Sequence, residues 1–238
     1  MQGAIAADHA PLKSPFVENS QRALAYGCGG LNIPGPTGEA DDLGYGVVLV
    51  LPPNCYQPVT DAGLIDWYKA LHAALGTRSI QIHFYNFPQM TGIGIPVEVI
   101  EELARHAPDR FAGIKDSSGD LDYCRAIAAA NPALAVFLKS EVAIEPAHAD
   151  GFAGCISASG NMTAPLAAEI WELRAAPPAT RCRDLLRQGG AIAGPTLVAN
   201  VKSLAADRTM NALWRAVLPP FRPLPEAAGQ DLKIALKE

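Results

Sequence analysis

The 238-residue sequence has no run of lysine and arginine and no excess of positive charge. Its formal net charge is −5 and its pI is near 5.5. Since phosphate backbones are bound by basic faces, these values argue against a nucleic-acid-binding protein. No apolar run approaches the length of a membrane span, and no basic stretch followed by an apolar core opens the chain. We therefore expect neither a membrane protein nor a signal peptide.

Close groups of metal-ligating residues are also missing. The five histidines contain no HExxH motif, and the five cysteines are widely spaced without a CxxC motif. These absences argue against a zinc ribbon, a disulfide framework or a metal centre. Reduced thiols are typical of a cytoplasmic protein, and that is the location we expect. The cysteines are Cys28, Cys55, Cys124, Cys155 and Cys182.

Short apolar runs indicate buried strands, and helical patterns lie between them. The runs do not alternate with polar residues, which is typical of parallel strands covered on both faces. The resulting alternation of strand and helix predicts an α/β fold with a parallel sheet. The predicted strands are Gly30–Ile33, Val47–Leu51, Ile80–Phe84, Phe111–Ile114, Leu134–Leu138 and Ala153–Ile156. The predicted helices are Thr60–Leu75, Pro96–Ala107, Leu121–Ala130, Thr163–Arg174 and a short C-terminal helix after Leu218–Pro225.

Polar residues follow several of these strands and help to choose between two α/β architectures. A doubly wound open sheet usually binds its ligand at one switch point. A TIM-type (β/α)8 barrel instead gathers chemistry from the carboxyl ends of many strands. The pattern therefore favours the barrel. The segments concerned are Pro36–Glu39, Tyr85–Asn86, Lys115–Ser117 and Ser157–Ser159.

Lys115 and Tyr85 are the side chains best suited to covalent chemistry. Lys115 directly follows the apolar run Phe111–Ile114, and a neutral amine in a partly desolvated pocket can form a Schiff base with a ketone. Tyr85 ends another strand, where a phenol can transfer protons. Each residue has an ordinary alternative, a solvated lysine that opens a loop and an aromatic ring at the edge of the core.

The segment Gly35–Glu39 is rich in turn-forming residues. Its backbone N–H groups and the Thr37 hydroxyl could hold a carboxylate. It lacks the length and the lysine of a phosphate-binding loop, so it does not predict nucleotide binding.

Three segments together resemble the dihydrodipicolinate synthase/N-acetylneuraminate lyase family of class I aldolases. They are Tyr85–Pro88 (YNFP), Gly113–Asp120 (GIKDSSGD) and Gly154–Ser157 (GCIS), the last followed by Asn161 and Pro165. The segment Gly35–Glu39 (GPTGE) is similar to that family's carboxylate-binding loop, and Val47–Pro53 to its fourth strand.

The resemblance implies a TIM-type barrel over residues 1–175 with a helical extension over 176–238. It implies a homo-oligomer, a dimer or tetramer, and chemistry without a metal or organic cofactor. The substrate would be pyruvate or another 2-oxo acid, which forms an imine with Lys115 while Tyr85 transfers protons. The substrate-binding residues would be Pro36, Thr37, Gly38, Ile156 and Ser157.

The sequence departs from the family pattern at three positions. Pro36 provides neither a hydroxyl nor a backbone donor. Asn54 and Cys55 stand where a relay tyrosine is usual, and Tyr56 is displaced by one residue. Met90 occupies the position of an arginine that holds the second substrate in the synthase.

These departures favour a sugar-acid lyase, a dehydratase or another 2-oxo acid aldolase over 4-hydroxy-tetrahydrodipicolinate synthase. An impaired family member that binds a 2-oxo acid and an unrelated α/β barrel enzyme are the alternatives.

Chain length between the early elements also departs from the family. A parallel crossover needs a dozen residues or more, and Ala40–Gly46 provides fewer. Ser14–Gly27 is similarly short for a loop and a helix. We therefore expect that part of the early barrel, around Ala40–Gly46, is missing.

Overall fold

The computed structural model describes residues 23–26, 34–54, 57–144 and 149–237. The chain divides into two compact units. The first, called the sheet unit, comprises residues 1–139 and 150–153. The second, called the helical unit, comprises residues 140–149 and 154–238. The division does not fall at residue 175, because the helix that precedes this position groups with the C-terminal helices. The assignment of residues 1–175 to a barrel and 176–238 to an extension stays a prediction.

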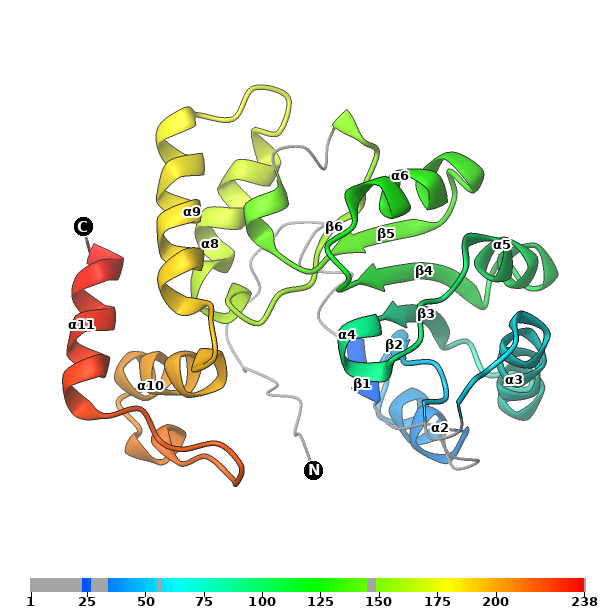
Figure 1. Cartoon of the computed structure of the whole chain (residues 1–238), viewed down its shortest axis with the longest axis horizontal. Helices are drawn as coiled ribbons and strands as arrows, with labels where there is room; N and C mark the ends of the chain where they lie inside the picture. The colour runs from blue at the N-terminus through cyan, green and yellow to red at the C-terminus, as the bar shows by residue number, and fades with distance from the viewer. Residues whose placement is uncertain (1–22, 27–33, 55–56, 145–148, 238) are drawn as a thin grey trace. The chain divides into compact units, whose positions relative to one another are not determined.

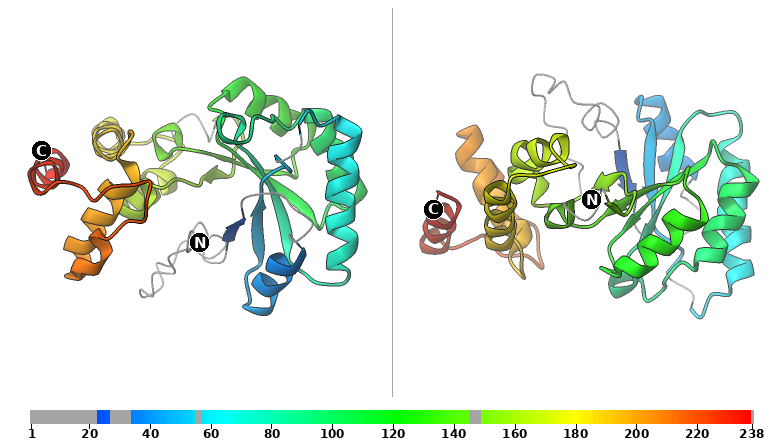
Figure 2. Two further views of the ribbon diagram at one scale, coloured as in Figure 1. Left: turned by 60° about the horizontal axis from the view of Figure 1, so that its bottom comes forward. Right: turned by 90° about the horizontal axis from the view of Figure 1, so that it is seen from above.

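The sheet unit contains parallel strands that pair in the order of the sequence (Figures 1 and 2). The strands are β1 (Ala23–Tyr26), β2 (Val47–Val50), β3 (Gln81–Asn86), β4 (Phe111–Asp116) and β5 (Ala135–Leu138). The helices are α2 (Pro34–Asp42), α3 (Asp61–Leu75), α4 (Pro88–Thr91), α5 (Val97–His106) and α6 (Leu121–Ala130). The longer helices lie along one side of the sheet, where α2 packs against α3, α3 against α5, and α5 against α6 (Figure 1). A doubly wound sheet would carry helices on both faces, so this arrangement supports the barrel-type prediction.

Aromatic packing joins the sheet to its outer helices. The rings of Phe84 on β3 and Phe111 on β4 stack at a centroid distance of 5.5 Å. Tyr68 of α3 meets Phe84 edge-on at 5.0 Å, and its hydroxyl donates to the Val50 carbonyl. α3 begins at Thr60, whose side chain accepts a hydrogen bond from the Gly63 N–H, as an N-cap residue should. Burial of this aromatic group fixes the strands on which the site residues lie.

The early chain differs from the sequence-based prediction. The first described strand is β1, which pairs directly with β2, and α2 is the described element between them in the chain. The described sheet is open at β1, which agrees with the prediction that part of the early barrel is missing. The predicted strand Gly30–Ile33 lies outside the described residues. The segment Gly35–Glu39, predicted as a turn, is instead helical within α2.

Proline and glycine explain why α2 was read as a turn. Pro34 and Pro36 lie in its first turn, where the missing N–H costs nothing. Gly38 lies in the interior of the helix, where glycine is unfavourable relative to alanine. Local propensity therefore opposes this helix, and its tertiary contacts decide the conformation.

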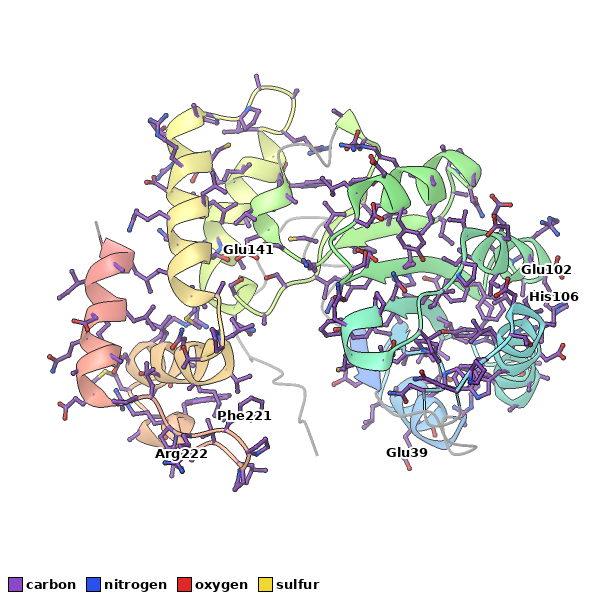
Figure 3. All side chains as sticks on the ribbon, viewed as in Figure 1. Glu39, Glu102, His106, Glu141, Phe221 and Arg222 are labelled. Atoms are coloured by element: carbon purple, nitrogen blue, oxygen red, sulfur yellow. The ribbon has the colours of Figure 1, made fainter. Side chains whose placement is uncertain are left out.

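The helical unit has a core of its own. One cluster of buried side chains joins Ile144 to α8 and α9, and a second joins α9, α10 and α11. Glu141, labelled in Figure 3, is buried there and accepts a hydrogen bond from the Thr163 hydroxyl at 2.8 Å. The elements are η1 (Glu141–Ala143), β6 (Gly154–Cys155), α8 (Gly160–Glu172), α9 (Ala179–Ile192), α10 (Leu197–Thr209), η2 (Ala212–Arg215) and α11 (Glu226–Lys237). None of the helices in the described part of the chain is long and apolar enough to cross a membrane.

Candidate active site

Lys115 and Tyr85 lie side by side on neighbouring strands. They are direct register partners between β4 and β3. The Lys115 Nζ atom donates a hydrogen bond to the Tyr85 hydroxyl at 3.0 Å, and it lies 4.2 Å from the centroid of the Tyr85 ring. Both side chains are half-buried. The structure thus brings together an amine and a phenol that are thirty positions apart in the sequence, at the carboxyl ends of their strands.

A buried polar network fixes the ends of these two strands. The Asn86 amide donates to Asp116 Oδ1 at 2.7 Å, and Asn86 Oδ1 accepts from the Ile95 N–H at 3.1 Å. Asp116 Oδ2 accepts from the Ser118 hydroxyl and from the Gly119 N–H. Buried polar groups with all partners in place make a segment rigid. Because Asn86 and Asp116 directly follow Tyr85 and Lys115, this network positions the amine and the phenol.

A layer of packed side chains from β3, β4 and β5 lies next to Lys115 and Tyr85. The rings of His83 and Phe137 stack at 5.7 Å across Gly113. A Cβ atom at Gly113 would lie only 2.7 Å from His83 Cε1 and 2.8 Å from the Ala135 carbonyl oxygen. Burial lowers the pKa of His83 to about 4, so its imidazole is neutral at pH 7. The layer therefore adds no charge next to Lys115.

The predicted carboxylate-binding residues Pro36, Thr37 and Gly38 all lie in α2. Arg78, three residues before β3, donates to the Gly38 carbonyl at 3.1 Å, which holds the middle of α2 toward the amino ends of the strands. The Thr37 side chain is fully buried and its hydroxyl has no hydrogen-bond partner among the described residues. Glu39 is exposed and points away from the sheet (Figure 3). The structure thus does not join these residues to Lys115, and their role in binding stays a prediction.

Ile156 and Ser157 belong to the helical unit and directly follow β6. Both are half-buried, and the Ser157 hydroxyl lies 2.9 Å from the Ser159 hydroxyl. Their predicted contact with a ketoacid stays a prediction.

One residue at the carboxyl ends of the strands was not singled out from the sequence. Lys139 directly follows β5, and its Nζ atom would lie 2.7 Å from a Cβ atom built on Gly119, in the loop after β4. The sequence pattern that singled out Lys115 also applies to Lys139, because Lys139 directly follows the apolar run Leu134–Leu138 as Lys115 follows Phe111–Ile114.

In the described part of the chain, no cluster of three or more histidine, cysteine, aspartate or glutamate side chains could hold a metal ion. The group hydrogen-bonded to the Lys115 amine is the Tyr85 hydroxyl, and together these two groups can supply a nucleophilic amine and a proton-transferring phenol.

Comparison with known proteins identifies the family. Residues 35–238 of this chain match the model of the dihydrodipicolinate synthetase family. The chain belongs to this family. An uncharacterized DapA-like lyase from Chloroflexus aurantiacus is 30% identical over 190 residues, which cover 79% of this chain and 59% of the relative. The chain thus spans about three fifths of that protein's length.

Solved structures of the family share the fold. N-acetylneuraminate lyase from Fusobacterium nucleatum aligns with a TM-score of 0.77 and 18% identity over 90% of this chain and 73% of the lyase. A prophage protein of the family from E. coli K12, solved in complex with pyruvate, aligns with a TM-score of 0.72 and 23% identity. That alignment covers 86% of this chain and 70% of the prophage protein. The likeness confirms the TIM-type barrel fold, of which the described strands form an open part.

Proposed function

We propose that the protein is a class I aldolase or lyase that binds a 2-oxo acid covalently through Lys115. The observation that carries this proposal is the 3.0 Å hydrogen bond between the Lys115 amine and the Tyr85 hydroxyl. Family membership supports it, and so does the pyruvate complex of the related prophage protein. An amine held against a phenol combines a nucleophile with a group that moves its protons.

The chemistry follows from these two groups. The Lys115 nitrogen adds to the ketone carbon, and the former carbonyl oxygen leaves as water after taking up one proton from the amine and one from solvent. Tyr85 transfers the proton of the substrate hydroxyl in the step that follows. The protonated imine then withdraws electrons from the neighbouring carbon. Either a carbon–carbon bond breaks with loss of a hydroxyl proton, or a hydroxide leaves after a carbon-bound proton is removed. Hydrolysis of the imine returns the amine, so aldol cleavage and dehydration share one intermediate.

The substrate proposed is a sugar acid or another hydroxylated 2-oxo acid. Met90, which is 53% exposed on α4, cannot pair with the carboxylate of a second substrate as an arginine would. Relatives of this chain nevertheless include proteins named 4-hydroxy-tetrahydrodipicolinate synthase, such as one from Novosphingobium aromaticivorans that is 34% identical over 134 residues. This match covers 55% of this chain and 43% of the relative. Synthase activity is therefore the first alternative.

A binding protein without turnover is the second candidate. It is favoured by the helical conformation of Gly35–Glu39, which buries the Thr37 hydroxyl instead of presenting it to a ligand. Such a protein would form the imine with a 2-oxo acid, hydrolyse it, and release the 2-oxo acid unchanged.

Assembly and location are proposed from the family resemblance and from the thiols. We propose a homo-oligomer in the cytoplasm. The cysteines Cys124 and Cys155 are thiols outside any disulfide, and burial raises the pKa of each to about 12. Such thiols stay protonated and are poorly reactive at neutral pH.

Reductive trapping tests the proposal. The protein is incubated with pyruvate and borohydride, which reduces the C=N bond, and the adduct is located by intact mass and peptide mapping. We expect one adduct on Lys115, none in Lys115→Met, and a normal adduct in Lys69→Met. Lys69 is a suitable control because it lies on the outer helices, 3.0 Å from Glu102 (labelled in Figure 3). Absence of an adduct on Lys115 would contradict the proposal, and an adduct without cleavage or dehydration of sugar acids would favour the binding protein.

A further inference from the structure

Lys139 is a second cation on the side of the sheet unit where Lys115 lies. Phe137 is the register partner of Lys115 between β5 and β4. Lys139 directly follows β5, two residues after Phe137. Its Nζ atom reaches Gly119, which follows β4 with a positive φ of 86°. The two lysines thus end neighbouring strands of one sheet at the same edge.

The acidic residues next to Lys139 are bound to other groups. Asp116 accepts hydrogen bonds from Asn86, from Ser118 and from the Gly119 N–H. Asp120 caps α6, where its carboxylate accepts from the N–H groups of Asp122 and Tyr123. Lys139 is exposed, and no carboxylate in the described part of the chain forms an ion pair with it. An ammonium group is therefore presented to solvent above a loop whose two carboxylates, Asp116 and Asp120, accept hydrogen bonds from other groups.

Glycine at position 119 makes this placement possible. Its φ of 86° favours glycine, and a Cβ atom there would lie 2.7 Å from the Lys139 Nζ atom and 3.2 Å from its Cε atom, so that the end of the lysine side chain would have to shift. Gly119 is held by Asp116, and the Ser118 carbonyl accepts from Gln89 of α4 at 2.8 Å. The loop under Lys139 is thereby fixed to the ends of both strands that carry the proposed catalytic pair.

We propose that Lys139 determines substrate specificity by binding a second anionic group at the far end of the 2-oxo acid held by Lys115. This inference rests on the proposed function. It narrows the substrate class to 2-oxo acids that carry a distal carboxylate or phosphate in addition to the carboxylate next to the ketone. A lysine ammonium binds either anion as a point charge through three rotatable donors, so both groups share the recognition chemistry.

Borohydride trapping at graded ligand concentrations measures the preference. The probes are 2-oxoglutarate, with a distal carboxylate, 2-oxo-4-phosphonobutanoate, with a distal phosphonate, and 2-oxohexanoate, with an uncharged end. We expect half-maximal trapping on Lys115 at a concentration about tenfold lower for at least one dianion than for 2-oxohexanoate, as for one charge-assisted hydrogen bond. The dianion with the lower value identifies the group that Lys139 binds.

Variants connect the preference to Lys139. Lys139→Gln should make the half-maximal trapping concentrations of the dianion and of 2-oxohexanoate equal. Lys139→Arg should keep most of the wild-type ratio between them. Lys69→Gln, which removes an equal charge from the outer helices, should leave the ratio unchanged. The ratio should also fall as salt rises, because the ammonium is exposed.

The outcomes separate this inference from the proposed function. If pyruvate is trapped on Lys115 but the wild-type protein shows no preference for a dianion, the role of Lys139 is refuted and the imine chemistry stands. A preference that persists in Lys139→Gln, or an adduct on Lys139 itself, refutes it as well. If no 2-oxo acid is trapped on Lys115, both proposals fail.

Discussion

Two regions of the sheet unit hold residues of the proposed site, and they differ in how completely their polar groups are satisfied. At the ends of β3 and β4, Asn86 and Asp116 join in a buried network that positions Tyr85 and Lys115. In α2 the Thr37 hydroxyl is buried without a hydrogen-bond partner among the described residues. A satisfied buried network has one favourable arrangement, whereas an unpartnered hydroxyl gains by any change that provides a partner. The amine and phenol are therefore fixed in position by their neighbours, whereas the predicted carboxylate-binding hydroxyl of Thr37 is not.

The largest expected effect tests the chemical role of Tyr85 at the end of β3. Tyr85→Phe removes the hydroxyl that accepts from Lys115 and should lower turnover of a cleavable 2-oxo acid by about a thousandfold, within the range of general acid–base catalysis. Rapid-quench measurements of product and trapped imine will show the imine retained. Equal turnover in the variant would remove Tyr85 from the mechanism.

The next effect concerns the pH dependence of stability and the buried His83 beside the proposed catalytic pair. His83 has a pKa of about 4 in the folded protein because it is buried, against about 6.5 in an unfolded chain. Above pH 6.5 the imidazole is neutral in both states and has no effect. As the pH falls from 6.5 to about 4, the unfolded state binds a proton that the folded state does not, so about 3 kcal/mol of stability is lost.

Urea unfolding of the wild type and of His83→Gln between pH 7 and pH 4 measures this loss. Between pH 7 and pH 4, the free energy of unfolding of the variant should fall by about 3 kcal/mol less than that of the wild type. Burial also lowers the pKa of His72, so some acid sensitivity remains in the variant. Identical pH dependence of the two proteins would exclude His83 as the source.

A smaller effect tests the network itself. Asn86→Leu leaves Asp116 Oδ1 and the Ile95 N–H buried without their partner, and should lower the free energy of unfolding by about 2 kcal/mol. Gln89→Leu is the matched control, because Gln89 is exposed and its amide donates a single hydrogen bond among the described residues, to the Ser118 carbonyl. Its effect should stay within about 0.5 kcal/mol. Equal destabilisation by the two variants would contradict the importance of the buried network.

The smallest effect distinguishes the two regions most directly. Thr37→Val removes a buried hydroxyl that lacks a partner and should change the free energy of unfolding by less than about 1 kcal/mol, toward greater stability. If Thr37 binds the ketoacid carboxylate, the same variant will raise the pyruvate concentration needed for half-maximal trapping severalfold. Unchanged trapping would exclude Thr37 from the site.

Much of the sheet unit follows from patterns in the sequence. The helix over Leu121–Ala130 is α6 as predicted, because Asp120 caps it and apolar residues repeat at helical spacing. The predicted run Phe111–Ile114 forms β4, which continues through Lys115 to Asp116. These elements are determined by nearby residues, so local reasoning finds them.

The early chain could not be predicted in this way. β1 was missed, and α2 was predicted as a turn because its glycines and prolines disfavour a helix. The conformation of α2 depends on Arg78, which is forty positions from Gly38. Arg78 donates to the Gly38 carbonyl and forms ion pairs with Asp41 and Asp42. No local pattern carries that information.

The sequence by itself determined the class of fold, the family and the identity of Lys115 and Tyr85 as the candidate pair. Local apolar periodicity and short motifs carry that much, because they depend on residues close together in the chain. Only the tertiary structure decided that the amine and the phenol meet at 3.0 Å, that Thr37 is buried, and that Lys139 reaches Gly119. These facts depend on strand register and on side-chain packing between distant segments, which a one-dimensional pattern does not contain.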